Sequence, residues 1–511
     1  MVCTAAPAAV SAAKRVDAER AQAIAASVPK VARELRRHRG AEPRTTSKPG
    51  ARLEVAYFAR GDEVAQVLID ARSGKVLEAW TGFQVAWTMA RGYPGAFGNK
   101  LNAPYVWLPL CLLFALPFLD PRRLRRLLHL DLAVLLAFSV AYWLFNQARI
   151  GASVALVCPL LLYLLVRLLL AARRPPREAP RLLVPVSWLG AATVFLIAFR
   201  IVLNIFDSSV IDVGYASVVG ADRVADGREL YGAFPSDVDH GDTYGPFVYY
   251  AYLPFEQLLR WSGRWDTLPA AHAAAIAFDL LTIAALWLLG RRLRGRDFGV
   301  VLAYAWAACP FTLLALNTNT NDGLVALLVT LALLLAGSPF ARGALGVLAA
   351  GAKLGPVAAL PVLLTHGGGG RRALALASLG ALGATLALGG PLLLGGDLGS
   401  FYERTIAFQA DRDSPFSPWG YHDGLGWLHT AVAAGAVLVA LGVALRPRGD
   451  DVVRLAALLG AALVAVQLSA THWFYLYIVW FLPALLVVLL TPPARVAGTA
   501  RWSPHAAAAQ P

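Results

Sequence analysis

The residues best suited to chemistry lie in a polar stretch from Asp207 to Glu256, which interrupts a chain that is mostly apolar after residue 104. Only two arginines offset the eight carboxylates that this stretch holds up to residue 242: Asp207, Asp212, Asp222, Asp226, Glu229, Asp237, Asp239 and Asp242. Aromatic residues are mixed with them and include Tyr215, Tyr231, Phe234, Tyr244, Phe247, Tyr249 and Tyr250. A carboxylate can deprotonate a hydroxyl nucleophile, and aromatic rings can stack on sugars or hold a loop at a membrane interface. We therefore expect this stretch to carry the chemistry.

Two further polar segments could meet this stretch, because loops on a rigid scaffold commonly form active sites. One is residues 401–425, FYERTIAFQADRDSPFSPWGYHDGL, and the other is Thr471-His472-Trp473 before the last apolar run. They supply candidate contacts to a phosphate or a sugar: Arg404, Arg412, His422 and His472. A histidine at a helix end can equally serve as a helix cap.

Arg200, Asp279 and Lys353 are among the charged residues that lie inside apolar segments, where such groups usually face protein or water. Arg200 stands seven residues before Asp207 and could pair with it, bind a lipid phosphate or snorkel to the interface. Asp279 needs a partner, and Lys353 could either pair with it or contact a phosphate. We interpret Lys353 as structural, because the expected topology places it near the side of the basic loops.

No motif in the chain predicts a cofactor. The sequence contains no GxGxxG, Walker A, HExxH or nucleophile-elbow pattern. Asp237, Asp239 and Asp242 could ligate a divalent cation through carboxylate oxygens, although their spacing fits no established loop. We predict no cofactor and keep a divalent cation as the alternative.

Composition then sets the class of protein that positions these residues. The chain has 511 residues, of which 58% are hydrophobic and 15% charged, and its mean hydropathy is +0.56. A soluble protein carries about 25% charged residues. The net charge of +14 comes from arginines in short loops between apolar runs, which is typical of membrane topology rather than of nucleic-acid binding. The four cysteines, Cys3, Cys111, Cys158 and Cys309, have no metal-binding spacing and predict no disulfide framework.

Twelve apolar runs approach or reach the length that spans a bilayer: residues 104–119, 130–147, 152–171, 184–206, 269–290, 298–316, 323–336, 343–364, 373–394, 427–445, 453–470 and 473–490. Arginine clusters lie at 121–126, 173–181, 291–296, 371–372 and 446–454. If these face the cytoplasm, residues 207–268 and 395–426 form external loops. Lys353, Gly355 and Pro356 interrupt the run 343–364, whose flanks both look cytoplasmic. We therefore predict two short helices that enter and leave on the same side, with the break buried in protein.

The N-terminal residues differ in pattern from the rest. Residues 17–39 predict a helix that Pro29 interrupts, and residues 53–59, 65–71 and 76–82 predict strands. The tight turn at Asp70-Ala-Arg-Ser-Gly74-Lys75 resembles that of the PepSY-type fold, a small α+β domain of regulatory or binding use; an ordinary hairpin at a membrane surface is the alternative. The expected topology puts this domain outside the cell. No clear signal sequence precedes it, so we expect that the start of this sequence is truncated or wrong.

A family resemblance emerges from the order of several short motifs. They are Asp212-Val-Gly-Tyr215, Gly227-Arg-Glu-Leu-Tyr231, Tyr244-Gly-Pro246 with Leu253-Pro254-Phe255, Asn321-Asp322, and Ala352-Lys353-Leu354-Gly355-Pro356. Over residues 184–490 this order resembles GT-C glycosyltransferases, and family 87, the polyprenyl-phosphate-mannose type, is the most similar. Residues 1–172 have no counterpart in a minimal enzyme of that family, and Tyr244-Gly-Pro replaces the commoner Tyr-Pro-Pro.

The resemblance implies an inverting enzyme that takes a sugar from a lipid-linked phosphate on the outer face of the membrane. By position in the family pattern Asp212 is the candidate base, and Asp207 is the alternative because it is nearer the helix end. The remaining candidates would bind the donor phosphate or sugar: Arg200, Tyr215, Tyr231, Tyr244, Arg404, Arg412, His422 and His472.

We therefore predict an all-α polytopic membrane protein of GT-C type with about 11–13 transmembrane helices and a small N-terminal α+β domain. The expected parts are an N-terminal segment 1–50, a PepSY-like domain 51–100, three extra spans 101–182, a catalytic region 183–492 and a disordered tail 493–511. The expected function is transfer of a hexose, mannose first, from a polyprenyl phosphate to an extracytoplasmic glycan or lipid at the cell membrane. The alternatives are a transporter or flippase of lipid-linked saccharide, or a non-catalytic sensor.

Overall fold

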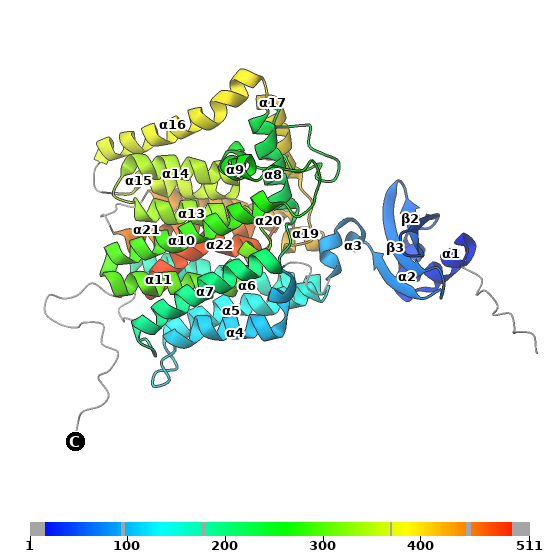
Figure 1. Ribbon diagram of the computed structural model, residues 1–511, viewed down its shortest axis with the longest axis horizontal. Helices are drawn as coiled ribbons and strands as arrows, with labels where there is room; N and C mark the ends of the chain where they lie inside the picture. The colour runs from blue at the N-terminus through cyan, green and yellow to red at the C-terminus, as the bar shows by residue number, and fades with distance from the viewer. Residues whose placement is uncertain (1–15, 93–97, 175–179, 368–369, 446–450, 493–511) are drawn as a thin grey trace, which may run out of the picture. The chain divides into compact units, whose positions relative to one another are not determined.

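The computed structural model describes residues 16–92, 98–174, 180–367, 370–445 and 451–492 (Figure 1). The chain divides into two compact units, which we describe separately. The first contains the described residues up to Gly92 together with Phe145–Arg149, and the second contains the rest. The predicted tail at 493–511 lies outside the described residues.

The first unit is an antiparallel sheet in the order β1-β2-β3-β4 with two helices packed on it. The strands are β1 (Glu42–Lys48), β2 (Arg52–Ala59), β3 (Asp62–Asp70) and β4 (Val76–Thr81). Helices α1 (Ala18–Ser27) and α2 (Pro29–Arg37) are separated at Pro29, which confirms the predicted interruption. Val31 of α2 and Val67 of β3 belong to one buried core. The unit therefore includes residues before 51, and its resemblance to the PepSY fold stays a prediction.

Strand β1 was not predicted, and its sequence EPRTTSK explains why. Six of its seven residues are exposed, so it has no alternation of apolar and polar side chains. It pairs through its backbone at the edge of the sheet. The turn after β3 is as predicted: Asp70 Oδ1 accepts hydrogen bonds from the N–H groups of Arg72 and Ser73, and Gly74 has φ +72°.

The second unit is a bundle of helices in which seven are long and apolar enough to cross a membrane, counting only the residues that the structure describes. They are α5 (Leu127–Asn146), α6 (Ile150–Arg173), α7 (Val186–Phe206), α10 (Pro269–Arg294), α16 (Gly370–Gly395), α20 (Gly426–Ala444) and α21 (Val452–Ser469). The pair α11 (Arg296–Ala308) and α12 (Pro310–Asn317) is bent by 59° and would make an eighth. The predicted polytopic, largely helical membrane protein is confirmed.

The remaining apolar runs form shorter helices: α4 (Pro104–Ala115), α13 (Asp322–Leu334), α14 (Pro339–Ala352), α15 (Leu360–Thr365) and α22 (Ile478–Leu490). Helices α13 and α22 are each about 20 Å long. Every residue of α22 is buried, and the helix lies in the middle of the bundle (Figure 1). A helix surrounded by protein need not match the thickness of a bilayer, so a count from apolar runs does not translate directly into full-length spans.

The run 343–364 forms a hairpin, as predicted. Helix α14 ends at Lys353, whose backbone is extended, and the chain continues through a 3₁₀ helix (Gly355–Ala359) into α15. A Cβ on Gly346 would lie 2.8 Å from Leu360 Cδ1, although 14 residues of straight helix would separate them by about 21 Å. The chain therefore turns back, and both ends of the hairpin lie on the same side.

Arg342 holds the two ends of the hairpin together. It is buried and donates hydrogen bonds to the carbonyl oxygens of Ala336, Leu363 and His366. Lys353 lies at the other end of α14, about 17 Å along the helix axis. The interpretation that placed Lys353 near the basic loops is therefore wrong. Lys353 lies at the turn of the hairpin, which is the end farthest from the hairpin base.

We predict that Arg342→Met will lower the thermal stability of the protein. The change leaves three buried carbonyl oxygens without their donor, and each such loss costs about 1–3 kcal/mol. Thermal melting of the purified protein in detergent measures the effect. Arg371→Met, on an exposed arginine at the start of α16, is the matched control. Equal melting temperatures for the two variants would show that Arg342 does not hold the hairpin.

Candidate active site

The segment that leads to Asp212 is held by the connection between α12 and α13. All five residues from Asn317 to Asn321 are buried. The N–H of Ile211 donates to the carbonyl of Thr318 at 3.2 Å. Asn319 Nδ2 donates to Ser208 Oγ at 3.0 Å and to the Ser209 carbonyl at 3.2 Å. These bonds fix the chain between the end of α7 and the start of α8 (Asp212–Ala225).

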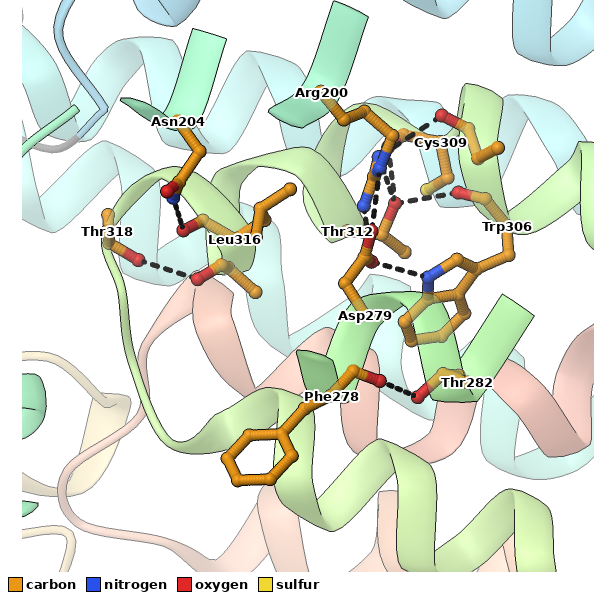
Figure 2. Close-up of polar contacts among 12 residues, drawn as sticks. Arg200, Asn204, Phe278, Asp279, Thr282, Trp306, Cys309, Thr312, Leu316 and Thr318 are labelled. Atoms are coloured by element: carbon orange, nitrogen blue, oxygen red, sulfur yellow. Dashed lines mark hydrogen bonds and ion pairs between the residues drawn. The ribbon is translucent and has the colours of Figure 1, made fainter. Parts of the chain in front are cut away.

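Beneath this connection, Arg200 and Asp279 form a buried ion pair that joins α7 to α10 (Figure 2). Arg200 Nε and Nη2 both bind the Asp279 carboxylate, and Arg200 Nη1 donates to Thr312 Oγ1 at 3.1 Å. Trp306 Nε1 donates to Asp279 Oδ1 at 2.8 Å. Two predicted pairings are therefore wrong: Arg200 does not pair with Asp207, nor Asp279 with Lys353. With 1% of its surface exposed, Arg200 offers no face to a donor phosphate.

Asn204, one turn beyond Arg200, connects this ion pair to the loop above. Its Nδ2 donates to the Leu316 carbonyl and to Asn319 Oδ1, both at 2.8 Å (Figure 2 shows the first). Its Oδ1 lies 3.0 Å from His272 Nδ1 of α10. One face of α7 therefore carries a row of buried polar groups that orients the loop.

Close backbone packing fixes the first turn of α8. A Cβ on Gly214 would lie 2.2 Å from the Asn319 carbonyl oxygen, so only glycine fits there. Tyr215, the next residue, is buried and stacks on Trp265 with ring centroids 4.8 Å apart. Its hydroxyl donates to Asp237 at 3.2 Å. Tyr215 therefore anchors α8 and does not present its ring to a sugar.

Asp212 is the first residue of α8, and solvent reaches its side chain. Protein nevertheless surrounds the carboxyl closely, and this desolvation raises its pKa. The Val213 N–H and the positive charges of Arg412 and Lys353 act in the opposite direction and favour the carboxylate. A solvent-accessible carboxyl with a raised pKa and two cations nearby is the arrangement expected of a general base.

Lys353 reaches this region from the tip of the hairpin. Its ammonium lies 2.7 Å from Asp322 Oδ1, which also accepts a 2.7 Å hydrogen bond from Trp480 Nε1. The rings of Tyr244, Tyr477 and Trp480 surround the ammonium, with centroids 5.3–5.7 Å away. We call Asp212, Asp322, Lys353, Arg412 and His472, with these three rings, the Asp212 cluster.

The segment 395–426 contributes Arg412 and Ser414 to the same region. Ser414 Oγ lies 2.9 Å from His472 Nδ1. Burial, together with the charges of Arg412 and Lys353, lowers the pKa of His472 well below its usual value. His472 is therefore neutral at neutral pH. Burial raises the pKa of the Tyr244 hydroxyl, and the nearby negative charge of Asp212 raises it further.

The structure therefore brings together Asp212, Tyr244, Arg412 and His472 from the predicted set, and it places the others elsewhere. Tyr231 is buried and donates to the Tyr244 carbonyl, so it supports the cluster from behind. Arg404 Nε lies 3.6 Å from Asp242 Oδ2, and His422 is exposed next to Tyr421. Asp207 accepts the Lys100 N–H and lies 3.7 Å from its ammonium.

Two of the three carboxylates proposed as cation ligands are engaged in other contacts. Asp237 accepts the Tyr215 hydroxyl, and Asp242 accepts the Gly232 N–H at 2.6 Å. Among the residues that the structure describes, no group of three or more histidines, cysteines or carboxylates could hold a metal ion. Whether transfer requires a divalent cation stays an untested question.

Sequence reasoning missed Lys353, Asp322, Tyr477 and Trp480. Lys353 carried a usable signal. A lysine two residues before Gly-Pro in an apolar run indicates a broken helix, and its buried charge needs a partner. Asp322 carried a similar one, at the first position of an apolar helix. The aromatic residues carried none, since aromatic side chains are common in apolar runs.

Comparison with known protein families indicates which class of reaction the chain supports. Residues 243–470 match the model of glycosyltransferase family 87. The match covers less than half of the chain. It includes Tyr244, Asp322, Lys353 and Arg412, but begins after Asp212 and ends before His472. No curated protein matches the chain. The family 87 match and the apolar helices together fit a GT-C-like membrane glycosyltransferase, which requires a sugar donor, an acceptor and a bilayer.

We predict that Gly214→Ala will reduce glycosyl transfer strongly. The added methyl group meets the Asn319 carbonyl, so the first turn of α8 must shift, at a cost of about 1–3 kcal/mol. A shift of about 1 Å at a catalytic group can lower a rate about 100-fold. Gly383→Ala in α16, where a Cβ meets no atom within 4 Å, is the control. Wild-type activity in Gly214→Ala would show that the packing of α8 does not set the position of Asp212.

Proposed function

We propose that this protein transfers a hexose, with mannose as the expected sugar, from a polyprenyl-phosphate donor to an extracytoplasmic glycan or lipid acceptor. The observation that carries the proposal is the position of Asp212 among Lys353, Arg412 and neutral His472. Glycosyl transfer needs a base for the acceptor and positive charge for the departing phosphate, and this cluster offers both. The match of residues 243–470 to family 87 supports the same reaction class.

In the proposed step, the acceptor hydroxyl attacks the anomeric carbon on the face opposite the phosphate. Asp212 accepts the hydroxyl proton as the new carbon–oxygen bond forms. The bond between the anomeric carbon and the phosphate oxygen breaks, and its electron pair leaves on the polyprenyl phosphate. The anomeric configuration is inverted, because only one displacement occurs.

Arg412 and Lys353 are the proposed partners of the leaving phosphate. Both influence the Asp212 carboxyl electrostatically, so a donor seated against them would place its anomeric carbon near the base. Tyr244 and Tyr477, partly exposed beside Lys353, offer aromatic faces to the sugar. These cations provide the charge stabilisation, and the proposed step therefore includes no metal ion.

The arginine loops support the proposed extracytoplasmic placement. At their ends away from the Asp212 cluster, α13 and α22 meet the arginine loop 291–296: Arg292 donates to the Leu334 carbonyl, and Arg294 donates to the Pro492 carbonyl. The positive-inside rule puts such segments in the cytoplasm, and the cluster then faces the outside of the cell membrane.

We predict that Asp212→Asn will lower turnover by about 100-fold to 10,000-fold, because the amide cannot accept the proton. Asp207→Asn, at the Lys100 contact, will stay within about tenfold of wild type, since a surface ion pair of that kind contributes little. The assay supplies the purified full-length protein with radiolabelled polyprenyl-phosphate-mannose and a membrane lipid extract, and it follows label into new product.

Matched melting temperatures would establish that both variants are folded. Equal transfer by wild type and Asp212→Asn would refute the assignment of the base, and selective loss in Asp207→Asn would move it to Asp207. If no label moves, the assay is repeated with glucose and arabinose donors. No transfer from any donor by the wild type would refute the enzymatic proposal and favour transport of a lipid-linked saccharide.

The pH dependence of transfer gives a separate test. Asp212 must be ionised to act as a base, so the rate falls as pH drops through its pKa, which desolvation raises above the usual 3.8. Arg412→Gln removes a charge that favours the carboxylate, so the acidic limb will move to higher pH. Arg264→Gln, on an exposed arginine paired with Asp266, will leave the limb in place. A limb that moves equally in both variants, or in neither, would contradict the role of Arg412.

A further inference from the structure

A cavity of about 810 Å³ lies between α5 and the end of α6, away from the Asp212 cluster. The loop 121–126 and the first turn of α5 form one wall, and Arg167 of α6, Arg174 and Pro180 beyond α6, and Leu489 of α22 form the rest. Among the described lining residues there is no carboxylate, and six are arginines: Arg122, Arg123, Arg125, Arg126, Arg167 and Arg174.

Two of the six arginines form ion pairs that hold the walls in place. Arg167 Nε lies 2.9 Å from Asp131 Oδ1, and this aspartate is fully buried. Arg126 Nη1 lies 3.3 Å from Asp120 Oδ2, in a pair that is also largely buried. Arg122, Arg125 and Arg174 line the cavity as well. The walls are thus fixed, and the lining residues that the structure describes carry an excess of positive charge.

Membrane topology accounts for arginines on this side of the protein but not for their convergence. Like charges on a free surface spread apart, because their repulsion is smaller at greater distance. Here guanidinium groups from two separate segments, the loop 121–126 and α6, face one hollow. An anion in the hollow would offset this repulsion, and concave sites focus the field that attracts it.

The chemistry of the walls indicates which anion. Guanidinium groups bind phosphate oxygens in a bidentate geometry, and arginine is favoured over lysine for this purpose. Leu124, Leu127, Leu128 and Leu489 make part of the wall apolar, and helix α5 enters the apolar span here. The volume lies within the range of small-molecule sites, about 300–1,000 Å³. We propose that this cavity binds the phosphate-bearing headgroup of an anionic membrane lipid.

This site is separate from the proposed donor site. Tyr477 of the Asp212 cluster and Leu489 of the cavity lie near opposite ends of α22, about 18 Å apart along the helix. Lipid bound in the cavity would hold α5, α6 and α22 together at this end of the bundle. It would therefore stabilise the protein without contacting the reacting groups.

Binding of defined lipids to the full-length protein in detergent tests the proposal. Dioctanoyl phosphatidylglycerol is titrated while melting temperature and affinity are measured, with dioctanoyl phosphatidylcholine and inorganic phosphate as comparison ligands. We expect saturable binding and stabilisation by phosphatidylglycerol only. The double variant Arg122→Gln/Arg125→Gln will bind it about tenfold or more weakly, because two of the cationic groups that attract the phosphate are removed.

The double variant Arg371→Gln/Arg372→Gln removes the same charge from exposed positions at the start of α16 and is the matched control. It will bind phosphatidylglycerol like the wild type. Equal weakening in both double variants would show diffuse attraction and overturn the site. Equal binding of inorganic phosphate would identify a free-phosphate site, and equal binding of phosphatidylcholine a purely apolar one; either would overturn the anionic-lipid proposal. Absence of saturable binding would do the same.

Discussion

The ion pair between Lys353 and Asp322 joins two of the places where apolar helices of this protein are interrupted. One interruption separates α12 from α13, and the other is the tip of the α14–α15 hairpin. Broken backbone within an apolar bundle must find its hydrogen bonds in protein, and a buried charge must find a partner. Asp322 meets the second need, since its carboxylate pairs with Lys353 and also accepts a hydrogen bond from the indole N–H of Trp480. The pair thereby ties α13, α14 and α22 together beside the proposed base.

Polar contacts, more than apolar packing, determine where Asp212 lies. The row on α7 runs from Arg200 through Asn204 to the loop at Asn319, and the loop holds the chain that enters α8. Apolar contacts are tolerant of small shifts, whereas hydrogen bonds fix direction within a narrow range. Gly214 adds a steric limit, because the Asn319 carbonyl occupies the space of a side chain. A base placed in this way is held to one position before any substrate binds.

The elements of this fold could be predicted from local patterns, but the contacts between them could not. The apolar runs predicted the helices, and Pro29 and Pro356 predicted breaks in them, because each of these signals lies within one segment of the sequence. Strand β1 was missed because edge pairing through the backbone leaves no apolar pattern. The partners of Arg200 and Lys353 were assigned wrongly because the pairing depends on which helices pack together. Tyr215 and Tyr231 were expected to meet a sugar, yet both are buried, since the same residue type serves in cores and at binding surfaces.

The charges of the Asp212 cluster also bear on the order of events in the proposed transfer. Asp212 and Asp322 balance Lys353 and Arg412, and His472 adds no charge because its pKa is lowered. When Asp212 accepts the acceptor proton, the cluster gains one positive charge as the departing phosphate gains one negative charge. The change therefore stabilises the products of the step more than its reactants, in surroundings where protein strengthens electrostatic interactions. A protonated His472 would favour the carboxylate form of Asp212 and make it a weaker proton acceptor, so a neutral histidine beside Arg412 and Lys353 suits the proposed base.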